Sequence, residues 1–177
     1  MAKIKRKVPK TRKLTDSEQA SLKYMKNKIA KNEYMKKSHL TLGTMLFYTY
    51  NPKDQKSPYD KTPLILVIAK SSKHVLGINF HWAPIEMRKK ILKIFMNANK
   101  TNIKNKKPLE LSKAMSKEMY RLCRPIFRKY IIKRMSKKCA VIPHTEMGYV
   151  INLRAEHFIG ISAEEAFRLA YIKLKRR

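Results

Sequence analysis

Histidine, cysteine and carboxylate side chains most often hold metals or carry protons, and this sequence offers few of them in a useful spacing. Its five histidines are scattered, without the CxxC or HxxxH spacing of a metal site. His81, beside Trp82, has the best claim to a special role, for which a structural hydrogen bond is the favoured explanation. Cys123 and Cys139 are expected to be buried thiols. We therefore expect no metal and no cofactor.

A metal-dependent nuclease is the enzyme class most compatible with a basic chain, because such enzymes cluster carboxylates around magnesium. The carboxylates near the expected strands are Asp54, Asp60 and Glu86, and no Glu-x-Lys pattern follows on a strand. Asp60 is instead expected to cap the loop before Pro63. The four glycines form no phosphate-binding loop. The favoured expectation is that the protein is not an enzyme, with a nuclease built around Asp60 and Glu86 as a remaining alternative.

The net charge points to binding rather than to catalysis. The 177 residues include 42 Lys+Arg against 12 Asp+Glu, a formal net charge of +30, so an anionic partner is expected. The charge is uneven, since residues 1–40 and 84–139 carry 25 of the 30 net positive charges. The segment between them is nearly neutral and rich in β-branched and aromatic residues. With 44% hydrophobic residues, the sequence indicates a folded core that carries two basic blocks.

The two basic blocks supply the candidate contact residues. The first opens with an arm that we expect to become ordered on an anionic partner, although a solvated tail is the plain alternative. In the second, four basic residues share one side of an expected helix, and guanidinium groups favour phosphates or carboxylates. A solvated helix face explains that stripe equally well. The residues expected to contact DNA or an acidic partner are Lys3, Lys5, Arg6, Lys7, Lys10, Arg12, Lys13, Arg88, Lys89, Lys93, Lys117, Arg121, Arg124 and Arg128.

These side chains must be positioned by helices and strands that hydrophobic periodicity and turn signals predict. The predicted helices cover residues 16–37, 84–98, 109–135 (interrupted at Pro125) and 162–174, and the predicted strands cover residues 43–50, 63–69, 74–80, 139–143 and 148–153. The first three strands predict an antiparallel meander. Together the elements predict an α+β fold, a small antiparallel sheet or barrel of about five strands flanked by helices. Residues 1–14 are expected to form a basic arm, 15–40 a basic amphipathic helix and 41–177 a single α+β domain.

Two details of this scheme are specific enough to be checked. The helix over 84–98 is expected to bury Ile85, Ile91, Leu92 and Phe95 and to expose Arg88, Lys89, Lys90 and Lys93. The helix over 16–37 has a thin apolar stripe and is expected to lie against the core or a neighbouring subunit. Tyr48, Tyr50 and Tyr59 are candidates for stacking on bases, but packing in a core explains them at least as well.

An anionic membrane could also attract this positive charge, but we expect no membrane partner. The longest apolar run, residues 63–69, is the length of a strand and far short of the roughly 18 residues that a membrane span needs. The start of the chain is basic, but no apolar stretch follows it as in a signal peptide.

Several stretches, taken together and in order, resemble a family of small virion-associated proteins of tailed bacteriophages. The resemblance runs roughly over residues 43–170, and the stretches that carry it are residues 43–53 (GTMLFYTYNPK), 59–66 (YDKTPLIL), 77–84 (GINFHWAP), 128–132 (RKYII) and 158–163 (FIGISA). The resemblance implies a structural or DNA-end-protecting component near the head–tail junction, and it implies no catalytic residues.

The residues and the resemblance together predict a structural component of a tailed-phage virion, in the portal, neck or tail, assembled in the cytoplasm of a bacterial host. Its expected partners are other virion proteins, further copies of itself in a ring, and double-stranded DNA. The first alternative is a sequence-independent DNA-binding protein that protects phage DNA ends, and the second is the nuclease.

Overall fold

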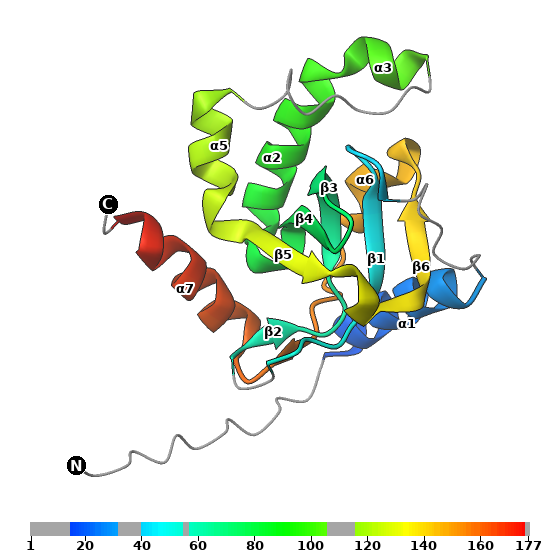
Figure 1. Ribbon diagram of the computed structural model, residues 1–177, viewed down its shortest axis with the longest axis vertical. Helices are drawn as coiled ribbons and strands as arrows, with labels where there is room; N and C mark the ends of the chain where they lie inside the picture. The colour runs from blue at the N-terminus through cyan, green and yellow to red at the C-terminus, as the bar shows by residue number, and fades with distance from the viewer. Residues whose placement is uncertain (1–14, 32–39, 55–56, 106–115, 176–177) are drawn as a thin grey trace.

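Five antiparallel strands form the central sheet of the computed structural model (Figure 1), which describes residues 15–31, 40–54, 57–105 and 116–175. The strands, in the order in which they pair, are β5 (Phe127–Ile131), β4 (His74–Asn79), β3 (Leu64–Lys70), β1 (Met45–Tyr50) and β6 (Met135–Ile142). The predicted α+β class, with about five antiparallel strands flanked by helices, is confirmed. The predicted arm over 1–14 lies outside the described residues.

Helices and short 3-10 turns connect and cover the strands. The helices are α1 (Asp16–Lys31), α2 (Ile85–Ala98), α3 (Lys100–Lys104), α5 (Lys117–Cys123), α6 (His144–Val150) and α7 (Ala163–Lys175). The 3-10 turns are η2 (Phe80–Trp82), η3 (Arg124–Ile126) and η4 (Ile132–Arg134), and a separate two-stranded ribbon pairs β2 (Tyr59–Asp60) with β7 (Phe158–Ile159). No helix in the described ranges is both long and apolar enough to cross a membrane.

The predicted meander is confirmed, because β1 pairs with β3 and β3 pairs with β4, each time antiparallel. Strand β3 reads as a continuous apolar run because both of its faces are buried. Leu64 and Leu66 belong to one hydrophobic core, whereas Ile65 and Val67 belong to another. This alternation follows from the two-residue period of a strand. The sheet therefore has an apolar core on each face.

Two predicted elements are wrong. Residues 148–153 were expected to form a strand, but α6 and a turn occupy this region because Met147, Val150 and Ile151 reach the core at helical spacing. The helix expected over 109–135 ends, within the described residues, at Cys123. Pro125 lacks an amide proton and disfavours helix at the residue before it, and the chain then enters β5, which pairs with β4.

The sheet is curled into an open barrel. Three strand spacings separate β5 from β1, which would be about 14 Å in a flat sheet. The ring centroids of Tyr50 on β1 and Tyr130 on β5 are nevertheless only 5.0 Å apart. The three residues of η4 join the edge strands β5 and β6, and the Asn51 amide donates to the Arg134 carbonyl at 3.1 Å. The inside of this curl is filled by one of the two cores, which we call the barrel core.

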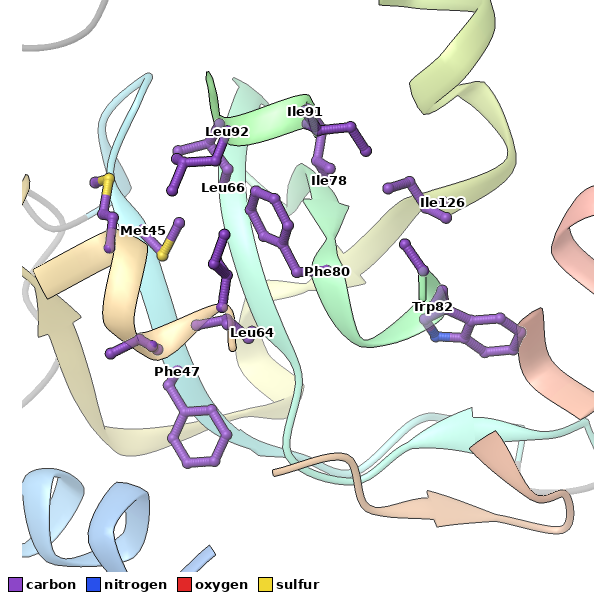
Figure 2. Packing of buried hydrophobic residues seen from close by; sticks show 14 of the residues in the cluster. Met45, Phe47, Leu64, Leu66, Ile78, Phe80, Trp82, Ile91, Leu92 and Ile126 are labelled. Carbon is purple, nitrogen blue, oxygen red and sulfur yellow. The ribbon is translucent and has the colours of Figure 1, made fainter. Parts of the chain in front are cut away.

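The other core, here called the helical core, lies between the sheet and the helices. Figure 2 shows Met45, Phe47, Leu64, Leu66 and Ile78 of the strands together with Ile91 and Leu92 of α2. Helix α1 adds Leu22 and Met25 to this core, so the expectation that it lies against the core is confirmed.

Two of the three tyrosines considered for base stacking are core residues. Tyr48 and Tyr50 are buried in the barrel core, where their rings meet Tyr130 edge to face. Tyr59 is only half-buried on β2. Packing in a core is therefore the correct explanation for Tyr48 and Tyr50.

Two glycines provide a paired stability test. We expect Gly77→Ala to lower the free energy of unfolding by about 1–3 kcal/mol, because the new methyl group would lie 3.0 Å from the Ile65 Cβ and 3.3 Å from the Leu66 carbonyl oxygen. Gly148→Ala, in exposed helical backbone with nothing within 4 Å of the new methyl group, should raise it by about 1 kcal/mol. Urea unfolding measures both changes, and equal effects would contradict the packing described around β4.

Candidate functional site

Arg88 does not belong to the basic surface, which corrects the prediction for α2. Arg88 is fully buried. Its Nε donates to the Ala83 carbonyl at 2.7 Å, and its guanidinium forms an ion pair with Glu156. Its Nη1 also donates to the carbonyls of Ile151 and Leu153, each at 3.3 Å. Arg88 therefore ties α2 to the segment that follows α6, and it is not available to DNA or to a partner.

The other predicted cations of the two helices are exposed. Lys89 and Lys93 lie on the outer side of α2, and Lys117 and Arg121 lie on α5. Helices α2 and α5 lie side by side on the helical side of the molecule (Figure 1). The structure thus brings these cations, with Arg124 on η3, to one region, which we call the helical basic face.

The helical basic face carries an exposed aromatic side chain. Tyr120 on α5 is 48% exposed, and its ring meets Phe127 edge to face with centroids 5.4 Å apart. Within the described residues, none of Lys117, Arg121 and Arg124 forms an ion pair with a carboxylate. The face therefore combines an aromatic ring held by Phe127 with three cations, Lys117, Arg121 and Arg124, that form no ion pair with a described carboxylate.

Arg128, the last predicted contact residue, is only partly available. Its guanidinium lies 3.9 Å from the centre of the Trp82 ring, and its Nη1 donates to the carbonyls of Pro125 and Phe127 at 2.8 Å. Burial lowers the pKa of Arg128 from its ordinary value, although the nearby Tyr130 and Asp60 act in the opposite direction. Arg128 thus holds the corner between η3 and β5. The seven predicted contact residues of the arm, Lys3 to Lys13, lie outside the described residues.

A buried polar network lies where β4 meets the β2 ribbon. The Asp60 carboxylate is within 2.9 Å of the His81 Nδ1, and it accepts hydrogen bonds from the Asn79 side-chain amide at 3.2 Å and the Thr62 backbone amide at 3.0 Å. The Asn79 amide also donates to the Tyr130 hydroxyl at 2.8 Å. All five residues are buried. The expected structural hydrogen bond of His81 and the expected loop cap by Asp60 are both present.

This network contains an acid–histidine pair like those that orient a catalytic base, but here the pair is buried. The side chains of Asp60 and His81 are each only 1% exposed, so a substrate does not reach them from solvent. Each polar contact of Asp60 ends on a residue that shapes the chain between β2 and η2. The network therefore joins the β2 ribbon to the barrel.

The two carboxylates proposed for a nuclease are not brought together as a site. Asp60 is buried in the network, whereas the Glu86 side chain is 83% exposed and pairs with Lys89 at 2.9 Å. In the part of the chain that the structure describes, no three histidine, cysteine or acidic side chains are grouped as metal ligands would be.

Both cysteines are buried free thiols, as the sequence predicts. Burial raises the pKa of Cys123 to about 12 and the pKa of Cys139 to about 11. Because the thiolate is the reactive form and remains a small fraction of both thiols up to pH 9, we expect the native protein to react with a thiol reagent far more slowly than the unfolded chain does at the same pH. Both thiols should react once guanidinium unfolds the chain. Rapid labelling of either thiol in the native protein would contradict their placement.

The structure also assembles a cationic cluster that the sequence-based list of contact residues omits. The carbonyl of Lys73, at the β3–β4 turn, accepts a hydrogen bond from the Ile132 amide of η4 at 3.0 Å. Residues distant in the sequence therefore meet where β5 turns into β6. The exposed cations there, which we call the barrel-end cluster, are Lys70, Lys73, Lys133, Arg134, Lys137 and Lys138. Only the pairing of η4 with the hairpin reveals this cluster.

Comparisons with protein-family models, with curated proteins and with solved structures find no match.

Proposed function

We propose that this protein is a structural component of a tailed-phage virion, in the portal, neck or tail, and that it has no catalytic role. In this proposal it packs against other virion proteins and against further copies of itself. The phage assignment comes from the resemblance of residues 43–170. The way it packs follows from the surfaces described above.

The helical basic face is the observation that carries the proposal. Arginine and tyrosine are enriched in the buried centres of protein–protein interfaces. Helix α5 and η3 expose Tyr120 together with Arg121 and Arg124. The charges of the two arginines are not neutralised by described carboxylates. An acidic surface on a neighbouring subunit would supply the missing charge and would accept bidentate hydrogen bonds from the guanidinium groups.

The buried features of the fold suit a structural role. Arg88 and the Asp60 network fix separate segments to the sheet through buried hydrogen bonds. Residues that perform chemistry must meet a substrate, and these residues do not face solvent. We therefore assign them to stability and assign the contacts with partners to the exposed cations.

The proposal is tested by quantitative mass spectrometry of purified particles of the phage that encodes this chain. We expect the protein in the particles at a fixed copy number, retained after washing with nuclease and moderate salt. Its absence from purified particles would overturn the proposal.

A pair of charge variants tests the role of the helical basic face. Arg121→Glu/Arg124→Glu should reduce incorporation into particles at least ten-fold, because it places like charges against an acidic neighbour. Lys23→Glu/Arg168→Glu changes the net charge by the same amount at exposed positions of α1 and α7 and should be incorporated normally. Equal incorporation of the two variants would refute a specific role for this face.

A further inference from the structure

The barrel-end cluster is built from segments that carry no acidic residue. Residues 70–78 and 127–138 contain neither aspartate nor glutamate. Pairing of β4 with β5 places His74 opposite Ile131, so the β3–β4 turn lies beside η4. The backbone hydrogen bond from Ile132 to Lys73 fixes this contact. The positive charge of the cluster is therefore a consequence of the fold and is concentrated on one end of the barrel.

The dimensions of the cluster are those of a phosphate-binding surface. From Arg134 to Lys138 an extended chain covers at most about 13 Å. Lys73 lies next to η4, on the side of the hairpin. Four exposed cations of this region, Lys73, Lys133, Arg134 and Lys137, are sufficient to contact several phosphates on both sides of a duplex groove, which is about 12 Å wide. Lysines on short turns reach phosphates without requiring a particular base sequence.

The composition of this surface favours nucleic acid over an acidic protein. A protein–protein interface needs an apolar or aromatic centre, such as Tyr120 provides on the helical basic face. Among the described residues, the exposed large hydrophobic side chains are Tyr24, Leu42, Tyr120, Val141, Tyr149 and Leu169, and none belongs to the turn at Lys73 or to residues 127–138. Protein–DNA interfaces are more polar and more positively charged.

We propose that the barrel-end cluster binds the phosphate backbone of double-stranded DNA without sequence preference. The inference rests on the proposed function, because the virion supplies packaged DNA as a neighbour, and it adds a second surface to the helical basic face. One protein would then contact a subunit through α5, which precedes β5, and DNA through the region where β5 turns into β6.

The test measures the affinity of the full chain for a random-sequence duplex of 30 base pairs by fluorescence anisotropy, between 50 and 200 mM NaCl. The barrel-end variant is Lys73→Glu/Lys133→Glu/Arg134→Glu. The matched control, Lys89→Glu/Lys93→Glu/Arg121→Glu, changes the net charge equally on the helical basic face. We expect the barrel-end variant to raise Kd at least ten-fold more than the control. The slope of log K against log salt should become shallower by about 3, since three phosphate contacts are lost.

Three outcomes would overturn the inference. The first is equal loss of affinity in both variants, which would show that only net charge matters. The second is failure of the unaltered protein to bind duplex DNA at 50 mM NaCl. The third is displacement of DNA by polyglutamate as effectively as by unlabelled duplex, which would assign the cluster to an acidic protein. None of them removes the protein from purified particles, so failure here and failure of the proposed function are distinguishable.

A second variant shows whether a loss of DNA affinity comes from lost charge or from misfolding. Lys73→Gln/Lys133→Gln/Arg134→Gln removes three charges without reversing them, and it leaves intact the backbone hydrogen bonds of Lys73 and Arg134. Its circular dichroism and urea unfolding should match those of the unaltered protein. Its affinity for duplex DNA should still fall ten-fold or more, and an unchanged affinity would overturn the inference.

Discussion

Replacing Arg88 with methionine lowers the free energy of unfolding by about 3–5 kcal/mol, because the change leaves a carboxylate and several carbonyls without a hydrogen-bond donor in the interior. Methionine fills much of the volume of the arginine side chain, so the loss reports on polar contacts more than on packing. The stranded groups are Glu156 and the carbonyls of Ala83, Ile151 and Leu153. Urea unfolding followed by circular dichroism measures the loss.

The control for Arg88 is its neighbour on the same helix. Lys89→Met removes an exposed ion pair with Glu86 and should change the free energy of unfolding by less than about 1 kcal/mol. Adding Glu156→Gln to Arg88→Met should recover part of the loss, since no charge is then left without its partner. If Arg88→Met alone lowered the free energy of unfolding by less than about 1 kcal/mol, that result would contradict the buried ion pair and indicate that Arg88 is exposed.

Replacing Asp60 with alanine lowers the free energy of unfolding by a similar amount, about 3–5 kcal/mol. The carboxylate is the acceptor for the Thr62 amide and the Asn79 side chain and is paired with His81. Removing it leaves several buried polar groups without a partner, at about 1–3 kcal/mol each, although losses within one network do not add fully. The β2 ribbon should loosen first, with faster hydrogen exchange at the Lys61 amide, which donates to the His157 carbonyl.

Two further variants separate the network from the mere loss of a charge. Asp60→Asn keeps one oxygen acceptor for Thr62 but turns amide protons toward Asn79 and His81, so we expect an intermediate loss of about 1–3 kcal/mol. Glu86→Gln removes an exposed charge and should cost less than about 1 kcal/mol. If Asp60→Ala costs no more than Glu86→Gln, the network does not stabilise the fold.

The sequence predicts the elements whose signals are local. Strands β1, β3 and β4 have β-branched and aromatic residues between clear turn signals, and helix α2 follows a proline and keeps helical periodicity. The start of α7 is also a local signal, because the Ser162 hydroxyl accepts from the Glu165 amide at 3.1 Å, as the first residue of an S-x-x-E capping box does.

The errors arise where distant contacts override local signals. Residues 148–153 have the composition of a strand, yet the helical core selects the helix that places Met147 and Val150 inward. Residues 127–131 continue an apparently helical pattern, yet the open edge of β4 captures them as a strand. Strand composition depends strongly on context, so such segments are decided by their tertiary neighbours.

The candidate sites show the same division. Four cations were predictable from their spacing on a helix: Lys117, Arg121 and Arg124 are exposed as expected, whereas Arg128 is half-buried. Arg88 is buried against Glu156, which lies 68 residues later in the chain, and no local sequence pattern predicts that ion pair. The Asp60–His81 contact and the barrel-end cluster likewise join segments that only the folded chain brings together.

We propose that this protein occupies a fixed place in a virion, with its helical basic face against an acidic neighbour. A reconstruction of the particle that resolves side chains at the portal, neck and tail tests it most directly. We expect density for this chain in which carboxylates of an adjacent subunit lie within hydrogen-bond distance of Arg121 and Arg124. A particle that lacks the chain, or that leaves α5 open to solvent, would contradict it.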